Sequence, residues 1–190
     1  MNKQFGSNLD DYDFEKYEEN QFPIAYLITW RTYGTWLHGD ARHSVQRTRD
    51  DRFGTVMVEA SVPLVEHMSA EQKQPSLILT LVQRKIVAEA IRELCEYRSY
   101  TLRAENIRTN HAHAVISAQI KPEKIVNDLK TTATRRLRSA GLIGPSEKVW
   151  SRGASTRYLW KPKHVEAAVE YVLYSQGDAH FEIVTKIPED

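Results

Sequence analysis

The sequence has almost nothing that would point to a disulfide-bonded, secreted or membrane-spanning protein. Only one cysteine, Cys95, occurs among the 190 residues, so no internal disulfide can form. No segment approaches the roughly 20 consecutive apolar residues of a membrane helix, and the N-terminal segment lacks the apolar run of a signal peptide. We therefore expect a cytoplasmic protein with no membrane partner, in which Cys95 is a core thiol.

The charges are nearly balanced over the whole chain but unevenly distributed. Residues 1–20 contain six acidic residues and two lysines, a net charge of −4, whereas the whole chain carries +1. The other 170 residues therefore carry about +5 by subtraction. We interpret residues 1–21 as an acidic mobile N-terminal tail, and the basic excess of the rest as compatible with a polyanionic partner.

The chain length and the apolar content of 41% predict one folded domain. We place this domain at residues 22–178 and a C-terminal tail at residues 179–190. Within the domain, residues of about 40–75 show no lasting hydrophobic period, so a loop insertion is expected there.

Hydrophobic periodicity predicts an α+β fold. Strand-like and helix-like runs follow one another in the order β-α-β-β-α-β-α. The strands are expected at residues 24–30, 100–108, 111–119 and 156–160, and the helices at 81–98, from 122 onward and from 162 to about 177. A capping box at Thr80 and Gln83 supports the first helix. This order predicts a ferredoxin-like split βαβ fold, in which helices cover one face of an antiparallel sheet and the other face is free for a site.

Two histidines occupy alternate positions in the strand-like segment TNHAHAVISAQ. The strand period of two places His111 and His113 on one face and Ala112 and Ala114 on the other. The two histidine Cβ atoms would lie roughly 6.5–7 Å apart, so both rings could reach one metal ion. A metal site is one hypothesis, and a pair of ordinary strand histidines is the other.

The last helical segment, KPKHVEAAVEYVLYSQGD, contains two candidate tyrosines. Val165, Ala168 and Val172 belong to its apolar stripe, and Tyr171 lies off that stripe. Tyr174 is the neighbouring candidate. In isolation, either tyrosine more often packs as a half-buried aromatic than acts as a nucleophile.

Five segments of the sequence carry a recognisable combination of motifs. They are TWRTYGTWLHGD, NHAHAVISA, LKTTATRRLR, VWSRGASTRYLW and AVEYVLYSQGD. Together they resemble single-tyrosine HUH transposases, in particular the subgroup related to repeat-associated tyrosine transposases, over about residues 22–178. The resemblance implies an enzyme that cleaves and rejoins single-stranded DNA through a 5′-phosphotyrosine intermediate.

The same resemblance implies roles for individual residues. Tyr171 would be the nucleophile, and His111, His113 and Gln176 would bind a divalent cation, Mg²⁺ or Mn²⁺. In many relatives the third ligand follows the tyrosine by four residues, whereas Gln176 follows Tyr171 by five, so Ser175 or a water is the alternative. The expected partner is single-stranded or hairpin DNA, which would associate the protein with the nucleoid. A homodimer and a monomer are both compatible with the family.

Basic and hydroxyl side chains on one side of the second helix predict a phosphate track, which continues past the helix. The candidates are Lys130, Thr131, Thr134, Arg135, Arg138, Arg152, Arg157 and Lys161. Trp30, Tyr33 and Trp36 are candidates for stacking on bases or for core packing. Two rival functions remain: a domesticated DNA-binding protein that no longer cuts, and a metal-dependent phosphodiesterase in which water is the nucleophile.

Overall fold

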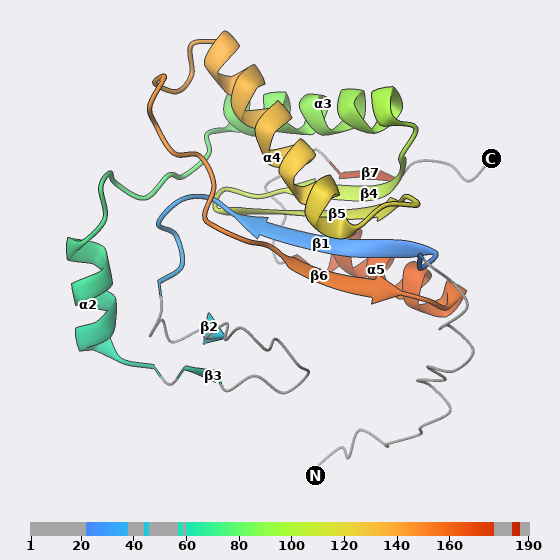
Figure 1. Cartoon of the computed structure of the whole chain (residues 1–190), viewed down its shortest axis with the longest axis horizontal. Helices are drawn as coiled ribbons and strands as arrows, with labels where there is room; N and C mark the ends of the chain where they lie inside the picture. Colours follow the sequence, from blue (N-terminus) through green and yellow to red (C-terminus); the bar gives the residue numbers. More distant parts are fainter. Residues whose placement is uncertain (1–21, 38–43, 46–56, 59, 177–183, 187–190) are drawn as a thin grey trace.

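The computed structural model describes residues 22–37, 44–45, 57–58, 60–176 and 184–186 (Figure 1). Its elements are β1 (Ala25–Arg31), β2 (Ser44–Val45), β3 (Met57–Val58), α2 (Val62–Ala70), α3 (Leu81–Arg98), β4 (Thr101–Ile107), β5 (His111–Ser117), α4 (Pro122–Ser139), β6 (Ser155–Leu159), α5 (Pro162–Tyr174) and β7 (Val184–Lys186). The N-terminal segment predicted to be an acidic tail lies outside the described residues.

Five strands form one antiparallel sheet in the order β6-β1-β5-β4-β7. The first four of these strands have the order of a ferredoxin-like fold, so the predicted fold class is confirmed. β7 pairs with β4 and comes from the segment that was expected to be a C-terminal tail. The register places His113 on β5 opposite Thr29 on β1 and Asn106 on β4.

The sheet separates two apolar clusters because successive side chains on a strand point to opposite faces. Helices α3 and α4 pack on one face against Ala112, Ala114 and Ile116 of β5 (Figure 1). Helix α5 lies on the other face, over β4 and β5, and packs against Val115. The second face was expected to be free for a site. The helix that carries Tyr171 instead covers part of this face.

Local signals account for the helix boundaries. The predicted helix at 81–98 and its capping box are confirmed, since the Thr80 side chain accepts from Gln83 N and the Gln83 side chain accepts from Thr80 N. Pro122 and Pro162 lie in the first turns of α4 and α5, as predicted.

None of the helices in the described ranges combines the length and apolar character needed to cross a membrane.

The predicted loop insertion at 40–75 contains a helix that periodicity did not show. Ser61 caps α2 by accepting from Leu64 N, and Pro63 follows in the first turn. No residue of α2 is buried, and its nine residues are fewer than the window of about 11 over which a helical period can be recognised. The expectation of a long loop was therefore wrong for Val62–Ala70.

A buried carboxyl group lies between α3 and the sheet. Glu105 is fully buried, and its Oε1 lies 2.6 Å from Arg92 Nη2. Burial raises the pKa of Glu105 to about 7, and the nearby Arg92 charge offsets only part of this rise. Burial also raises the pKa of the neighbouring Cys95 thiol to about 12, and Cys95 is 2% exposed, which confirms it as a core thiol.

We expect the Glu105 carboxyl to make the fold less stable as the pH rises. Its pKa is higher in the folded chain than the ordinary value of 4.5, so its contribution is fully present below pH 4.5 and is lost as the pH rises through about 7. That shift corresponds to about 3 kcal/mol. Urea unfolding of Glu105→Gln and of the unsubstituted chain between pH 4.5 and 8 should show the unsubstituted chain losing stability relative to the variant.

The exposed Glu93, which is bonded to Arg136, supplies the control. Glu93→Gln should leave the slope of stability against pH close to that of the unsubstituted chain. Parallel curves for Glu105→Gln and the unsubstituted chain would contradict the assignment.

Candidate active site

The two predicted histidines point to the same face of β5 and lie against each other. Their ring centroids are 4.7 Å apart and the rings are nearly perpendicular, at 84°. His113 is only 5% exposed, whereas His111 is half-buried at the start of the strand. The alternation predicted from the sequence is therefore confirmed, with the histidines and the alanines on opposite faces.

A neighbouring side chain binds Nδ1 of each imidazole. His111 Nδ1 lies 2.7 Å from Asn110 Oδ1, and His113 Nδ1 lies 2.7 Å from Thr29 Oγ1. The amide oxygen of Asn110 can only accept, so His111 Nδ1 donates and the lone pair of that ring is on Nε2. His113 Nε2 is buried and has no hydrogen-bond partner among the described residues.

His113 stays neutral over the physiological pH range. Burial is the main cause that lowers its pKa to about 3, and the His111 ring adds to the shift. The nearby Gln176 side chain offsets part of this fall in the pKa of His113. The contact does not have the geometry of a hydrogen bond to His113 Nε2. Arg108 and Arg31 lower the pKa further. A neutral imidazole with an unpartnered Nε2 is the form that binds a metal ion.

Tyr171 reaches the histidine pair from α5. Its ring centroid lies 5.7 Å from that of His113, with the rings nearly perpendicular, and 43% of the residue is exposed. Tyr174, the alternative, is 73% exposed and one turn further along the helix. The structure thus brings Tyr171, His111 and His113 together within a single chain.

The end of α5 explains the unusual spacing of Gln176. The helix ends at Tyr174, so residue 176 no longer follows the helical period from Tyr171. Gln176 Nε2 and Ser175 N both donate to Tyr171 O, at 3.2 and 3.1 Å. The amide nitrogen of Gln176 makes this contact, and its oxygen is the atom that a hard divalent cation would bind.

Within the described ranges, no group of three or more His, Cys, Asp or Glu side chains could hold a metal ion. A metal bound by His111 and His113 would therefore need ligands of another type, from this part of the chain, from water or from the substrate. Gln176 fits this requirement because its side chain lies beside His113.

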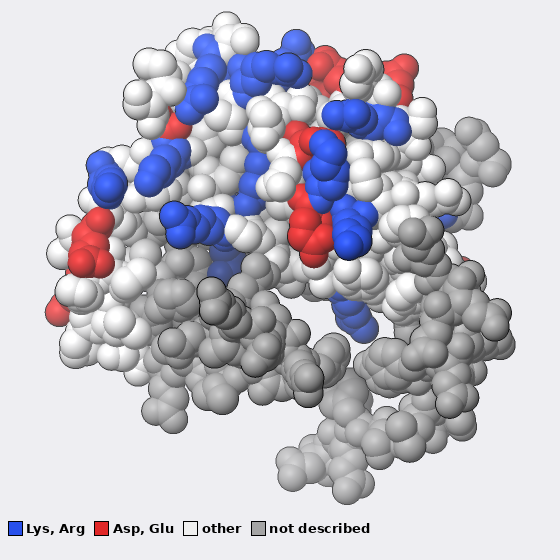
Figure 2. Space-filling view, in the orientation of Figure 1, with Lys and Arg blue, Asp and Glu red and all other residues white. Residues whose placement is uncertain are grey.

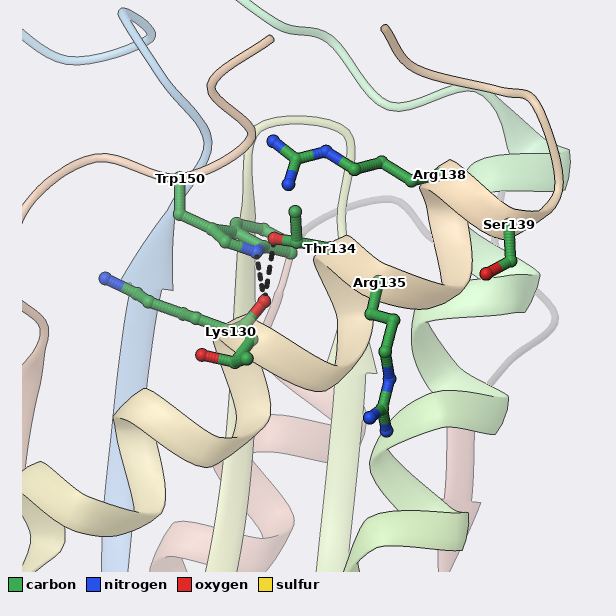
Figure 3. Close-up of a pocket in the computed structure, with 7 residues that line it drawn as sticks. Lys130, Thr134, Arg135, Arg138, Ser139 and Trp150 are labelled. Carbon is green, nitrogen blue, oxygen red and sulfur yellow. Dashed lines mark hydrogen bonds between the residues drawn. The ribbon is translucent and has the colours of Figure 1, made fainter. Parts of the chain in front are cut away.

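The predicted phosphate track on α4 forms one basic pocket. Its cavity of about 430 Å³ is lined by Lys130, Thr131, Thr134, Arg135, Arg138, Ser139 and Trp150. Figure 3 shows Lys130 and Arg138 extending on either side of the Trp150 ring, whereas Arg135 points away from it. Five of the predicted DNA-binding residues are thus neighbours, and Figure 2 shows basic side chains over this side of the molecule, with acidic ones among them.

Two of these basic side chains also hold the loop after α4. Lys130 Nζ donates to Ser151 O, at 2.9 Å, and to Gly153 O, and Arg138 Nη2 donates to Glu147 O. Trp150 Nε1 in turn donates to Lys130 O. The loop that forms one wall of the pocket is therefore fixed to α4.

The sequence matches the family model "Transposase IS200 like" over residues 67–185. The chain belongs to the IS200-like transposase family. His111, His113, Tyr171 and Gln176 all lie within the matched segment, which extends over more than half of the chain. No curated protein matches the sequence.

Two solved structures are similar to this transposase. The first is a REP-associated tyrosine transposase bound to a REP hairpin, with 11% identity and a TM-score of 0.46, over 81% of this chain and 67% of the other. The second is a candidate transposase from Deinococcus radiodurans R1, with 16% identity and a TM-score of 0.42, over 82% of this chain and 92% of the other.

The basic pocket and the histidine pair of the transposase lie on opposite faces of the sheet. Trp150 packs edge-to-face on Trp30, at 6.2 Å, within the cluster beneath α3 and α4. Arg157 pairs in register with Leu27, whose side chain contacts the α5 cluster, so Arg157 lies on the histidine face. Arg152 and Arg157 are exposed, and Lys161 is half-buried at the start of α5.

The aromatic residues after β1 differ in what they can contact. Trp30 is 1% exposed and part of the core, so it is unable to stack on bases. Lys148 Nζ lies 5.5 Å from the Tyr33 ring, and the Arg31 guanidinium lies 3.2 Å from the centroid of Trp36. One face of each of these two rings is therefore already covered by a cation.

Sequence reasoning missed Thr29 and Asn110, which hold the two imidazoles. Asn110 directly precedes His111, and an amide beside a candidate ligand was a usable signal. Thr29 lies 84 residues from His113 in the chain, and only the pairing of β1 with β5 brings the two together.

Replacing the Thr29 hydroxyl should destabilise the transposase. Thr29→Val keeps the shape of the side chain but leaves His113 Nδ1 without a partner in a buried position, which costs about 1–3 kcal/mol. Thr29→Ser keeps the hydroxyl and should lose less. Urea unfolding at pH 7 measures both changes, and equal stability of the two variants would show that the hydrogen bond contributes nothing.

Proposed function

We propose that this transposase cleaves and rejoins single-stranded DNA through a 5′-phosphotyrosine link at Tyr171. The observation that carries the proposal is the meeting of three side chains from distant parts of the chain. A partly exposed phenol lies beside one of two adjacent imidazoles, and that imidazole is held neutral. This combination supports nucleophilic catalysis at a phosphate better than it supports a purely structural role.

The reaction follows from the chemistry of the phenol. The Tyr171 oxygen attacks phosphorus, the bond from phosphorus to the 3′ oxygen breaks, and the phenol proton passes through solvent to the departing 3′ oxygen. The phosphodiester energy is kept in the new link. A second DNA 3′-hydroxyl can therefore reverse the step and join a new strand without a nucleotide cofactor.

A divalent cation, Mg²⁺ or Mn²⁺, belongs to the same proposal. His111, His113 and Gln176 would hold it, with Ser175 as the alternative to Gln176. The unpartnered and buried His113 Nε2 fits such a role, since a buried polar atom without a partner is costly. When bound, the cation would polarise the phosphoryl oxygen and offset the charge that develops on it. All of these groups lie in one chain, so the site does not require a homodimer.

The proposed DNA contacts extend over both faces of the sheet. The α4 pocket offers cations beside an aromatic ring, a combination that suits a phosphate backbone and its bases. Exposed Arg152 and Arg157 lie on the segment that leads from Trp150 to the histidine face. A single strand or a hairpin end could follow this route around the edge strand β6. Such binding would associate the protein with the nucleoid.

A covalent adduct tests the proposed reaction. We expect the full chain, incubated with a pool of hairpin-containing single strands and Mn²⁺, to form a denaturant-resistant protein–DNA species. Tyr171→Phe should abolish it because no phenol oxygen remains, and Tyr174→Phe should not. Gel electrophoresis under denaturing conditions gives the result.

The rival functions predict different products. Water as the nucleophile would give free 5′-phosphate ends, and Tyr171→Phe would still cut. A domesticated DNA-binding protein would bind the strands and release them unchanged. Either outcome would sink the phosphotyrosine proposal.

Neutralising the α4 pocket should weaken DNA binding. Arg135→Gln with Arg138→Gln removes two cations, so the slope of log affinity against log salt should fall by about 1 per lost contact. Exposed Lys73 and Lys85 provide a control with the same change in net charge, since both lie outside the pocket. Fluorescence anisotropy with a labelled strand measures the slopes, and equal slopes for the two double variants would remove the pocket from the interface.

A further inference from the structure

The end of β1 places a cation beside the histidine pair. Arg31 is the last residue of β1 and lies opposite His111 in the β1–β5 register. Thr29, two residues earlier, bonds to His113 on the histidine face. Because side chains two residues apart on a strand share a face, Arg31 leaves β1 on the same side as the two imidazoles.

The Arg31 guanidinium is held in a defined position. Its central carbon lies 3.2 Å from the centroid of the Trp36 ring, a stacked cation–π contact. The segment that carries Trp36 is fixed to the turn before His111, since Thr32 N, Thr32 Oγ1 and Thr35 Oγ1 all donate to Asn110 O. A stacked guanidinium still directs its N–H groups outward in its own plane, the geometry that binds a phosphate.

The charges around the histidine pair also favour an anion. Arg31 lies opposite His111 in the register of β1 and β5, and Arg108 N donates to His111 O, so the backbones of both arginines are next to the pair. A phosphodiester would supply negative charge beside the Arg31 guanidinium and the two imidazoles.

We propose that Arg31, held by Trp36, binds a non-bridging oxygen of the phosphodiester that Tyr171 attacks. The inference rests on the proposed function and names a residue outside the segment matched by the family model. Arg31 keeps its protons throughout. It donates hydrogen bonds to the phosphate as the bond from Tyr171 to phosphorus forms and the bond to the 3′ oxygen breaks, when charge on the phosphoryl oxygens is greatest.

A dinucleotide with a single phosphodiester gives a binding test that needs neither the target sequence nor cleavage. The probes are thymidylyl-thymidine and its neutral methylphosphonate analogue, followed through the ring NMR signals of His111 and His113. We expect the charged probe to shift these signals and to bind at least about fivefold more tightly than the neutral one. Arg31→Gln should abolish this preference, and Arg31→Lys should keep part of it as a point charge.

Arg103→Gln is the matched control, because Arg103 lies on the same sheet but is bonded to Ser117, at the other end of β5. It should keep the preference for the charged probe. A preference that survives in Arg31→Gln overturns the proposal, and so does the absence of any shift in the unsubstituted chain.

The rate of adduct formation separates this inference from the proposed function. The strand that is recovered from the adduct of the unsubstituted chain serves as the substrate. With this strand, Arg31→Gln should slow single-turnover formation of the adduct on the order of 100-fold while Mn²⁺ binding is unchanged. An unchanged rate would overturn the role of Arg31 and leave the phosphotyrosine proposal standing. If no adduct forms with the unsubstituted chain but the dinucleotide preference depends on Arg31, the phosphotyrosine proposal fails and the phosphate site stands.

Discussion

The register of β5 between β1 and β4 is the constraint on which the candidate site depends. Thr29, His113 and Asn106 lie in one row across three strands, and each contributes to the site face. Thr29 bonds to the imidazole, while Asn106 Nδ2 donates to Val172 O of α5. A shift of one residue would turn both histidines into the core beneath α3 and α4 and expose the alanines. The apolar packing of Ala112, Ala114 and Ile116 therefore fixes the position of the imidazoles.

The same sheet separates the two places at which we propose that the chain contacts DNA. Its α4 face carries the basic pocket, and its α5 face carries the tyrosine and the histidines. Strand β6 is the edge between them, and exposed Arg152 before the strand and exposed Arg157 within it provide positive charge along that edge. In the proposed function, the α4 face binds the DNA strand and the α5 face carries the groups that react with one phosphate.

The sequence predicted the fold and its main side chains because these leave local signals. The capping box at Thr80, the alternation around His113 and the proline in the first turn of α5 each depend on a few neighbouring residues. Helix α2 was missed because it is only nine residues long and none of them is buried. The role of Trp30 stayed open between base stacking and packing, since one strand alone does not show which face is covered. Thr29 and Arg31 were missed for the same reason, because their proximity to the histidines arises only from strand pairing.

The electrostatics of the site are consistent with two demands that usually conflict. An imidazole must be neutral to bind a metal, and burial together with nearby positive charge keeps His113 in that form. A phosphodiester needs positive charge, and in the proposed arrangement Arg31 and Arg108 are the same groups that disfavour protonation of His113. One set of cations therefore serves both demands. An acidic side chain in their place would favour a protonated, non-ligating imidazole and repel the DNA, so an arginine at the end of β1 suits the proposed site.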